Sequence, residues 1–138
     1  MITFCTFAFG IGCKCCFLFP MCKMARICPC FAGLWAIVNN AGIAGSVAPI
    51  EWQSADDFRQ TININLFGVI LVTKAFLPLV RRERGRVVNM ASSMGRFCMA
   101  TGPYGASKFA VEGFSDQLRY DLGIASCTVA CISILLQK

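Results

Sequence analysis

The sequence predicts an α/β fold in which a parallel sheet of about three strands is joined by two long helices. Short apolar runs of four to six residues, typical of buried parallel strands, recur along the chain. Between them lie longer stretches whose apolar residues recur at every third or fourth position, as on one face of a helix. The resulting order, strand–helix–strand–helix–strand, predicts parallel strands joined by right-handed crossovers.

The first strand is predicted over residues 34–38 and ends in the turn Asn39-Asn40-Ala41-Gly42. Ser54, with Asp57 three residues later, predicts a capping box that opens a helix over residues 55–80, weakened near Pro78. The expected inner face of this helix comprises Phe58, Ile62, Asn65, Val69, Val72 and Phe76. Asn65 is the polar member of that face. It either bonds backbone groups as a structural asparagine or belongs to a site.

The second strand is predicted over residues 87–90 and is followed by Ala91-Ser92-Ser93. Ser92 therefore stands just past the carboxyl end of a parallel strand, where open α/β sheets bind ligands. A second helix is predicted to begin at Gly102-Pro103 and to stop at Gly123. Residues 127–132 form the third predicted strand.

Tyr104 and Lys108 are four residues apart in the first turns of this second helix, so their side chains project from one face. A cation beside a phenol favours the phenolate. A hydroxyl from Ser92, twelve residues before Tyr104, could hydrogen-bond an alcohol or carbonyl oxygen at the same place. The three residues predict a site that moves a proton on and off a C–O group. The alternative is a surface helix pair of slight effect on stability.

Composition narrows the possible functions. The chain of 138 residues is one domain by size, 57% hydrophobic and 14% charged, and it has no histidine. Ser-His-Asp, Cys-His and histidine-ligated metal chemistry are therefore excluded. The net charge is +6, but residues 33–124 hold nine basic and seven acidic residues. The basic cluster at residues 81–86 is expected to be a solvated helix end, and without aromatic interleaving it does not predict nucleic-acid binding.

Residues 1–31 are unlike the remainder, with seven of the ten cysteines and no acidic residue. They lack the charged start of a secretory signal, the arginine and serine content of a transit peptide, and an uninterrupted apolar run. Their cysteines lack the paired spacing of a zinc site. We expect an atypical segment over residues 1–31, either an aberrant translated start or a membrane-associating segment, followed by a folded domain over residues 32–138.

The motifs Asn39-Asn40-Ala41-Gly42, Asn65, Ser92 and Tyr104-x-x-x-Lys108 resemble, in order and spacing, those of the short-chain dehydrogenase/reductases. Residues 33–42, 76–82 and 85–90 resemble the animal branch that acts on retinol, hydroxysteroids and D-β-hydroxybutyrate. Residues 114–120 lean toward the hydroxybutyrate enzymes. The likeness covers residues 33–124.

The resemblance implies a role for each motif. Tyr104 would be the acid/base, and Lys108 would favour its deprotonated form and hydrogen-bond the nicotinamide ribose. Ser92 would hold the substrate oxygen, and Asn65 would anchor a water in the proton relay. The Asn40-Ala41-Gly42 turn would lie against the cofactor. The implied cofactor is NAD or NADP, and the implied substrate is a small or lipophilic alcohol or ketone.

The chain also departs from the family pattern. The Thr-Gly-x-x-x-Gly-x-Gly turn that receives the pyrophosphate has no counterpart in residues 1–32, and the residue that selects NAD or NADP is missing. Only residues 133–138 follow the third strand. We therefore expect a partial Rossmann-like sheet lacking its N-terminal dinucleotide-binding half.

Three functions remain open after the sequence is read. The sequence is compatible with an active dehydrogenase, with a catalytically inactive fragment of one, and with an interaction module that pairs with a second copy through its two long helices. The family implies a mitochondrial or endoplasmic-reticulum membrane as the location, and the cytosol is the alternative.

Overall fold

A computed structural model describes residues 7–10, 33–97, 102–123 and 128–132 of the chain. Its sheet contains, in spatial order, β1 (Phe7–Gly10), β2 (Leu34–Asn39), β3 (Arg86–Met90) and β4 (Thr128–Ile132). The intervening elements are η2 (Ile50–Trp52), α1 (Ala55–Ile62), the π-helical turn η3 (Asn63–Phe67), α2 (Gly68–Arg82), η4 (Ser93–Gly95) and α3 (Gly102–Gly123).

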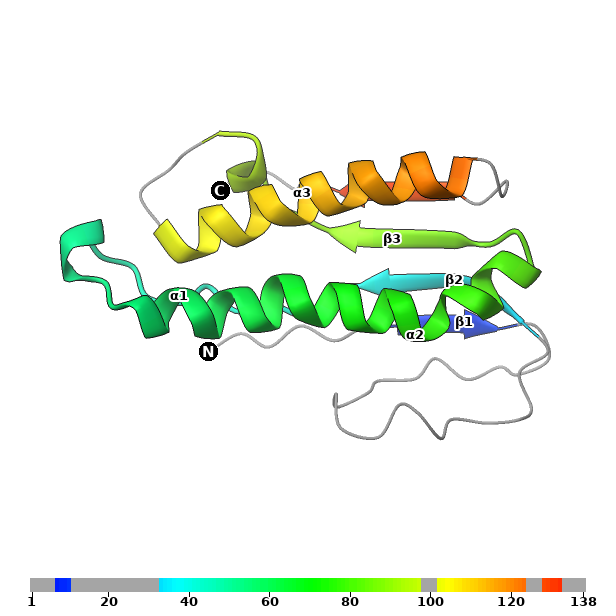
Figure 1. The fold of residues 1–138 in the computed structure, drawn as a ribbon, viewed down its shortest axis with the longest axis horizontal. Helices are drawn as coiled ribbons and strands as arrows, with labels where there is room; N and C mark the ends of the chain where they lie inside the picture. Colours follow the sequence, from blue (N-terminus) through cyan, green and yellow to red (C-terminus); the bar gives the residue numbers. More distant parts are fainter. Residues whose placement is uncertain (1–6, 11–32, 98–101, 124–127, 133–138) are drawn as a thin grey trace, which may run out of the picture.

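The three predicted strands are confirmed, and they are parallel. Ile37 of β2 is in register with Val87 of β3, and Val87 is in register with Val129 of β4. Because both crossovers run in the same direction across the sheet, α2 and α3 cover the same face of it (Figure 1). The carboxyl ends of β2, β3 and β4 therefore meet at one edge.

The first segment contributes a strand that the sequence does not predict. β1 pairs with β2 in the antiparallel sense, with Phe7 opposite Val38. The predicted parallel sheet of three strands is confirmed, and β1 adds an antiparallel strand along the outer edge of β2. An unpaired strand edge is a template for aggregation, so β1 protects the sheet where it would otherwise be open.

The helical stretch after β2 is continuous from Ala55 to Arg82 and comprises α1, η3 and α2. The predicted capping box is confirmed: the Ser54 backbone N–H and hydroxyl both donate to Asp57, at 2.8 and 2.7 Å, and the Asp57 N–H donates back to the hydroxyl at 3.2 Å. The hydrogen bond from the Ser54 hydroxyl, and to a lesser degree the one from its backbone N–H, lowers the pKa of the Asp57 carboxyl. The helix passes through Pro78 and ends at Arg81 and Arg82, so the basic cluster begins at a helix end as predicted.

The same stretch is long and apolar enough to cross a membrane, with 28 residues and a mean hydropathy of 1.7 in its most apolar window. Val72, Phe76 and Val80, however, lie on its inner face and belong to the hydrophobic core. Helices that cover a sheet carry the same apolar content. Length and composition alone therefore do not assign this helix to a membrane.

The core lies between the sheet and the two helices. Its buried members come from β2, α2, β3, α3 and β4, and they are Leu34, Ile37, Val72, Phe76, Val80, Val87, Leu118, Leu122 and Val129. A close turn leads into β3 at Gly85, where a Cβ would lie 2.5 Å from the Leu34 carbonyl oxygen. Only glycine permits this approach of two backbones.

A chain of buried polar side chains crosses the core. The Asn39 amide donates to Thr73 Oγ1 at 3.0 Å and to Asn89 Oδ1 at 2.8 Å. The Asn89 amide in turn donates to Ser115 Oγ at 2.8 Å. These hydrogen bonds connect α2, β2, β3 and α3. Since a buried polar group is costly without a partner, they favour one relative placement of the four elements.

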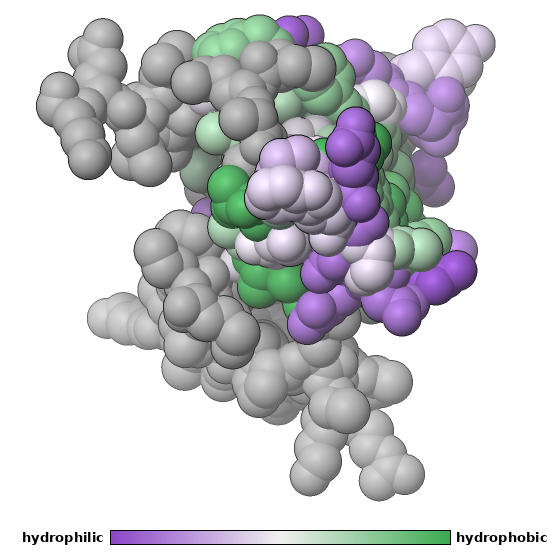
Figure 2. Space-filling view, turned by 90° about the vertical axis from the view of Figure 1, so that its left-hand side faces the viewer, coloured by the Kyte–Doolittle hydropathy of each residue, from purple (hydrophilic) through white to green (hydrophobic). Residues whose placement is uncertain are grey.

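The end of the molecule that carries η2 presents mixed chemistry. Val47, Ile50 and Trp52 are exposed there, with Ile50 at 72%. Figure 2 looks at this end and shows hydrophobic and pale side chains beside strongly hydrophilic ones. These three side chains therefore face the solvent and do not belong to the core.

The packing predicts a sharp contrast between two isoleucines. Ile37→Ala removes a side chain that is 0% exposed, so it should lower the free energy of unfolding by about 2–5 kcal/mol. Ile50→Ala removes the same atoms from an exposed position and should change it by less than about 0.5 kcal/mol. Urea unfolding followed by circular dichroism measures both variants. Equal effects would contradict the core assignment.

Candidate active site

The predicted site residues gather at the carboxyl edge of the sheet. The Asn40-Ala41-Gly42 turn follows β2, and Ser92 follows β3. Tyr104 and Lys108 lie on the first turns of α3, which packs against η3, the element that holds Asn65. Segments far apart in the sequence therefore meet at the place where ligands bind in open α/β sheets.

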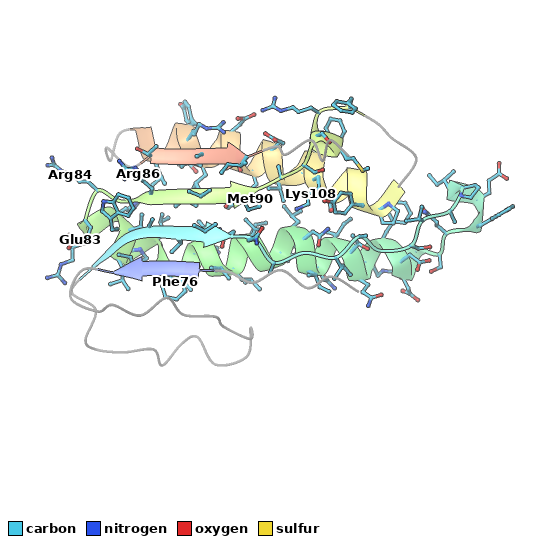
Figure 3. The ribbon with its side chains drawn as sticks, turned by 180° about the vertical axis from the view of Figure 1, so that it is seen from behind. Phe76, Glu83, Arg84, Arg86, Met90 and Lys108 are labelled. Carbon is cyan, nitrogen blue, oxygen red and sulfur yellow. The ribbon has the colours of Figure 1, made fainter. Side chains whose placement is uncertain are left out.

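Lys108 is buried and bonded to the end of β3. It is 6% exposed, and its Nζ donates to the Met90 carbonyl oxygen at 2.7 Å. Figure 3 shows Lys108 beside Met90, while Glu83, Arg84 and Arg86 lie at the opposite end of β3. The Lys108 Nζ is 5.6 Å from the centre of the Tyr104 ring. A fixed cation at this position is attracted to the ring face and lies beside the phenol.

Asn65 is fully buried, and its side-chain amide is engaged on every side. Its Oδ1 accepts from the Ile43 N–H at 2.8 Å, and its Nδ2 donates to the Ile43 carbonyl at 2.9 Å. The Nδ2 also donates to Ser107 Oγ at 2.9 Å, and Ser107 donates to the Tyr104 carbonyl at 2.7 Å. The Asn65 side chain therefore bonds backbone groups, as expected of a structural asparagine. The water-anchoring role stays a prediction.

The position of Asn65 within a π-helical turn is notable. Such turns are rare and are frequent at functional sites, because the extra residue re-aims the side chains of one turn. Here η3 spans Asn63–Phe67 and directs Asn65 inward, while Asn63 remains exposed. The periodicity of the sequence predicts an inward Asn65 but gives no sign of the altered helical turn.

Gly42 is where the turn after β2 meets the other residues. A Cβ at this position would lie 3.2 Å from Asn65 Oδ1 and 3.8 Å from Lys108 Nζ. The backbone of the turn therefore lies close to Asn65 and Lys108, and a side chain at this position would crowd the Asn65 amide. The cofactor contact expected of Asn40, Ala41 and Gly42 stays a prediction.

Ser92 lies in extended conformation at the start of η4, and its Oγ accepts from the Met94 N–H at 3.3 Å. Gly95 closes the same turn, with its N–H donating to the Ser92 carbonyl at 2.8 Å. The hydroxyl of Ser92 can still donate its own proton, because the bond from Met94 uses it as an acceptor. The choice of Ser92 over Ser93 as the substrate-binding serine stays a prediction.

Sequence reasoning missed four residues that support the site. Ser107 links Asn65 to Tyr104, the Met90 carbonyl receives Lys108, and Glu112 pairs with Arg96. Ser107 could have been noticed, since it precedes Lys108 and shares the helix face of Tyr104 at a three-residue spacing. A backbone carbonyl has no signature in a sequence, and neither has a pairing between residues 16 positions apart.

Comparison with known proteins identifies the family. The short chain dehydrogenase family model matches residues 23–135, so the chain belongs to the short-chain dehydrogenases. Members of this family are NAD(P)-dependent oxidoreductases, and the recognition made from the sequence is confirmed. The match begins within residues 1–31, and the predicted division at residue 31 stays a prediction.

The chain is 49% identical over 100 residues to dehydrogenase/reductase SDR family member 9 of Bos taurus and 52% identical over 100 residues to retinol dehydrogenase 7 of Rattus norvegicus. Each alignment covers 72% of this chain and about a third of the relative, 31% and 32%. A short-chain dehydrogenase from Escherichia coli CFT073 in complex with NADPH superimposes with a TM-score of 0.75 at 29% identity. That match covers 85% of this chain and 53% of the other. The partial Rossmann-like fold is thereby confirmed.

The bonds of Asn65 predict a large effect of its removal. Asn65→Ala would leave the Ile43 N–H and C=O without their side-chain partner in a part-buried turn, so the free energy of unfolding should fall by about 1–3 kcal/mol. Asn63→Ala, two residues away and exposed, should change it by less than about 0.5 kcal/mol. Urea unfolding and amide exchange at Ile43 measure both. If the Ile43 amide exchanges as slowly in the Asn65→Ala variant as in the wild type, Asn65 does not hold the turn.

Proposed function

We propose that this chain carries the proton-transfer side of an NAD(P)-dependent oxidoreductase site that interconverts an alcohol and a carbonyl, with Tyr104, Lys108, Ser92 and Asn65 as its residues. The observation that carries the proposal is the buried Lys108, which is bonded to the end of β3 with its ammonium 5.6 Å from the Tyr104 ring centre. A buried ammonium is costly, so its presence beside a phenol at a ligand-binding edge favours a chemical role.

In oxidation, the alcohol proton would pass to the Tyr104 oxygen, while Lys108 offsets the negative charge on that oxygen. Ser92 would donate a hydrogen bond to the substrate oxygen and fix its position. Asn65 holds the turn after β2 and, through Ser107, the first turn of α3, so it sets the distance between them. In reduction the same groups would return the proton to the carbonyl oxygen.

The hydride would be exchanged with a bound nicotinamide cofactor. The residues described here that fit such a group are the Asn40-Ala41-Gly42 turn and Lys108, because the backbone at Gly42 comes close to the Lys108 ammonium at the carboxyl edge of the sheet. They would hold the nicotinamide and its ribose. The choice between NAD and NADP stays open, since the sequence shows no selecting residue.

The substrate class that we propose is a lipophilic alcohol of the retinol type. Two relatives at 52% and 50% identity bear the names retinol dehydrogenase 7 and retinol dehydrogenase 16. The resemblance of residues 114–120 to hydroxybutyrate enzymes has no counterpart in these names and stays a prediction. A lipophilic substrate is also compatible with the alternative of membrane association.

The proposal predicts that Tyr104→Phe slows turnover strongly while cofactor binding is retained. Removal of the acid/base should lower kcat by at least about 100-fold. Tyr120→Phe is the matched control, because Tyr120 is the only other tyrosine in the chain and is 79% exposed. Retinol oxidation with NAD and NADP measures turnover, and quenching or enhancement of NADH and NADPH fluorescence measures binding. A wild-type chain that neither binds nor turns over would refute the proposal.

A second candidate is an interaction module formed by the two long helices. Phe67 on η3, Leu71 on α2 and Phe109 on α3 are 49%, 58% and 43% exposed. Large apolar side chains exposed on adjacent helices are typical of surfaces that pair with another chain. This candidate is favoured if the chain binds no nicotinamide cofactor.

The interaction module predicts a dimer in solution that Leu71→Glu disrupts, since a charge would then be buried at the interface. Ile50→Glu introduces the same charge at an exposed apolar position away from the helices and should leave the dimer intact. Size-exclusion chromatography with light scattering measures both. A monomeric wild-type chain would exclude the module.

A further inference from the structure

The site contains a buried carboxylate that the proposed reaction does not use. Glu112 lies on α3 one turn after Lys108 and two turns after Tyr104, so the three residues share one face of the helix. Its side chain is 7% exposed, and Arg96 Nη2 donates to Glu112 Oε2 at 2.8 Å. A carboxylate buried to this degree requires a charged or hydrogen-bonding partner.

Arg96 is part of the turn that carries Ser92. Its backbone N–H donates to the Ser93 carbonyl at 2.9 Å, and the preceding N–H, that of Gly95, donates to the Ser92 carbonyl at 2.8 Å. The Met94 N–H donates to Ser92 Oγ. A displacement of Arg96 therefore moves the backbone bonds that orient Ser92.

The same turn is pressed against α3 between Lys108 and Glu112. Gly95 is buried, and a Cβ there would lie 2.9 Å from the Lys108 carbonyl oxygen and 3.2 Å from Glu112 Cγ. Gly113 on the same helix has no atom within 4 Å of the corresponding position, so the close approach is confined to this face. The Arg96–Glu112 ion pair lies beside that contact.

The pair is asymmetric, because the Arg96 side chain is 63% exposed while Glu112 is buried. Arginine at the rim loses little hydration, whereas its guanidinium gives the buried carboxylate a directional partner. Buried ion pairs often contribute little net stability compared with an apolar replacement. Such a pair is better suited to fix a geometry than to stabilise the whole fold.

We propose that Arg96 and Glu112 are positioning residues: their ion pair holds the Ser92 turn against the helix face that carries Tyr104 and Lys108. We call this ion pair, with the contact between the Ser92 turn and α3, the clamp. The effect of the clamp on catalysis rests on the proposed function of Ser92, whereas the existence of the clamp does not. The pair would fix the substrate-binding hydroxyl relative to the proton-transfer groups. Loss of the pair would release the turn without unfolding the helix.

Native-state amide hydrogen exchange on the full chain tests this directly. In Glu112→Gln the amides of Met94, Gly95 and Arg96 should exchange at least about tenfold faster, because the turn opens locally more often, while the amides of Val111 and Leu118 in α3 keep their rates. The matched control is Asp116→Asn, which breaks an exposed ion pair with Arg119 one turn further along the same helix. It should leave the Ser92 turn unchanged.

Variants at Arg96 complete the test. Arg96→Lys retains a cation and should protect the turn better than Arg96→Met. The double variant Glu112→Gln with Arg96→Met removes both charges and is expected to fold even if a single variant does not. Amide exchange at the turn in the double variant should match that in each single variant, since all three variants lose the same ion pair. Uniform acceleration along the chain, an unchanged turn, or a turn already unprotected in the wild type would overturn the clamp.

Activity separates the clamp from the proposed function. If the wild-type chain turns over retinol, Glu112→Gln should lower kcat/KM by about 10-fold to 100-fold through misplacement of Ser92, and Asp116→Asn should not. If the wild-type chain is inactive, the proposed function fails, and the exchange rates at Met94, Gly95 and Arg96 still decide whether the clamp exists.

Discussion

The hydrogen bond from Lys108 to the Met90 carbonyl is the interaction on which the geometry of the site depends. It joins the first turns of α3 to the carboxyl end of β3 at 2.7 Å. Because the ammonium is buried, it cannot exchange this carbonyl for water without a cost in free energy. The bond therefore fixes the end of the sheet relative to the helix that carries Tyr104, and the turns after β2 and β3 are arranged around it.

Two further connections complete that arrangement. Asn65 holds the turn after β2 through Ile43 and reaches α3 through Ser107. Arg96 holds the turn after β3 to the same helix through Glu112. Each loop is thus tied to α3 by polar contacts to a buried side chain of that helix, whereas the apolar core below keeps the strands in register. Rigid supports of this kind are what a proton-transfer site requires, since small displacements of its groups reduce the rate strongly.

The sequence predicts the strands and helices well where local chemistry decides the structure. The apolar runs at β2, β3 and β4, the Ser54–Asp57 capping box and the helix end at Gly123 all follow from periodicity and capping. β1 was not predicted, because a strand in a cysteine-rich and phenylalanine-rich segment shows no alternation. The roles of the Met90 carbonyl and of Arg96 with Glu112 arise only from tertiary packing, and the π turn at Asn65 leaves no trace in residue spacing. Ser92, Tyr104 and Lys108 could be selected from the sequence because their residue types carry the chemistry.

The most direct test of this account is the chemical reactivity of Lys108 in the native chain. Reductive methylation followed by mass spectrometry compares Lys108, buried and bonded to Met90, with Lys74, exposed on α2. The account predicts that Lys74 is modified readily, whereas Lys108 reacts only when the chain unfolds in denaturant. Equal modification of the two lysines under native conditions would contradict it, because Lys108 would then not be the fixed cation around which the site is built.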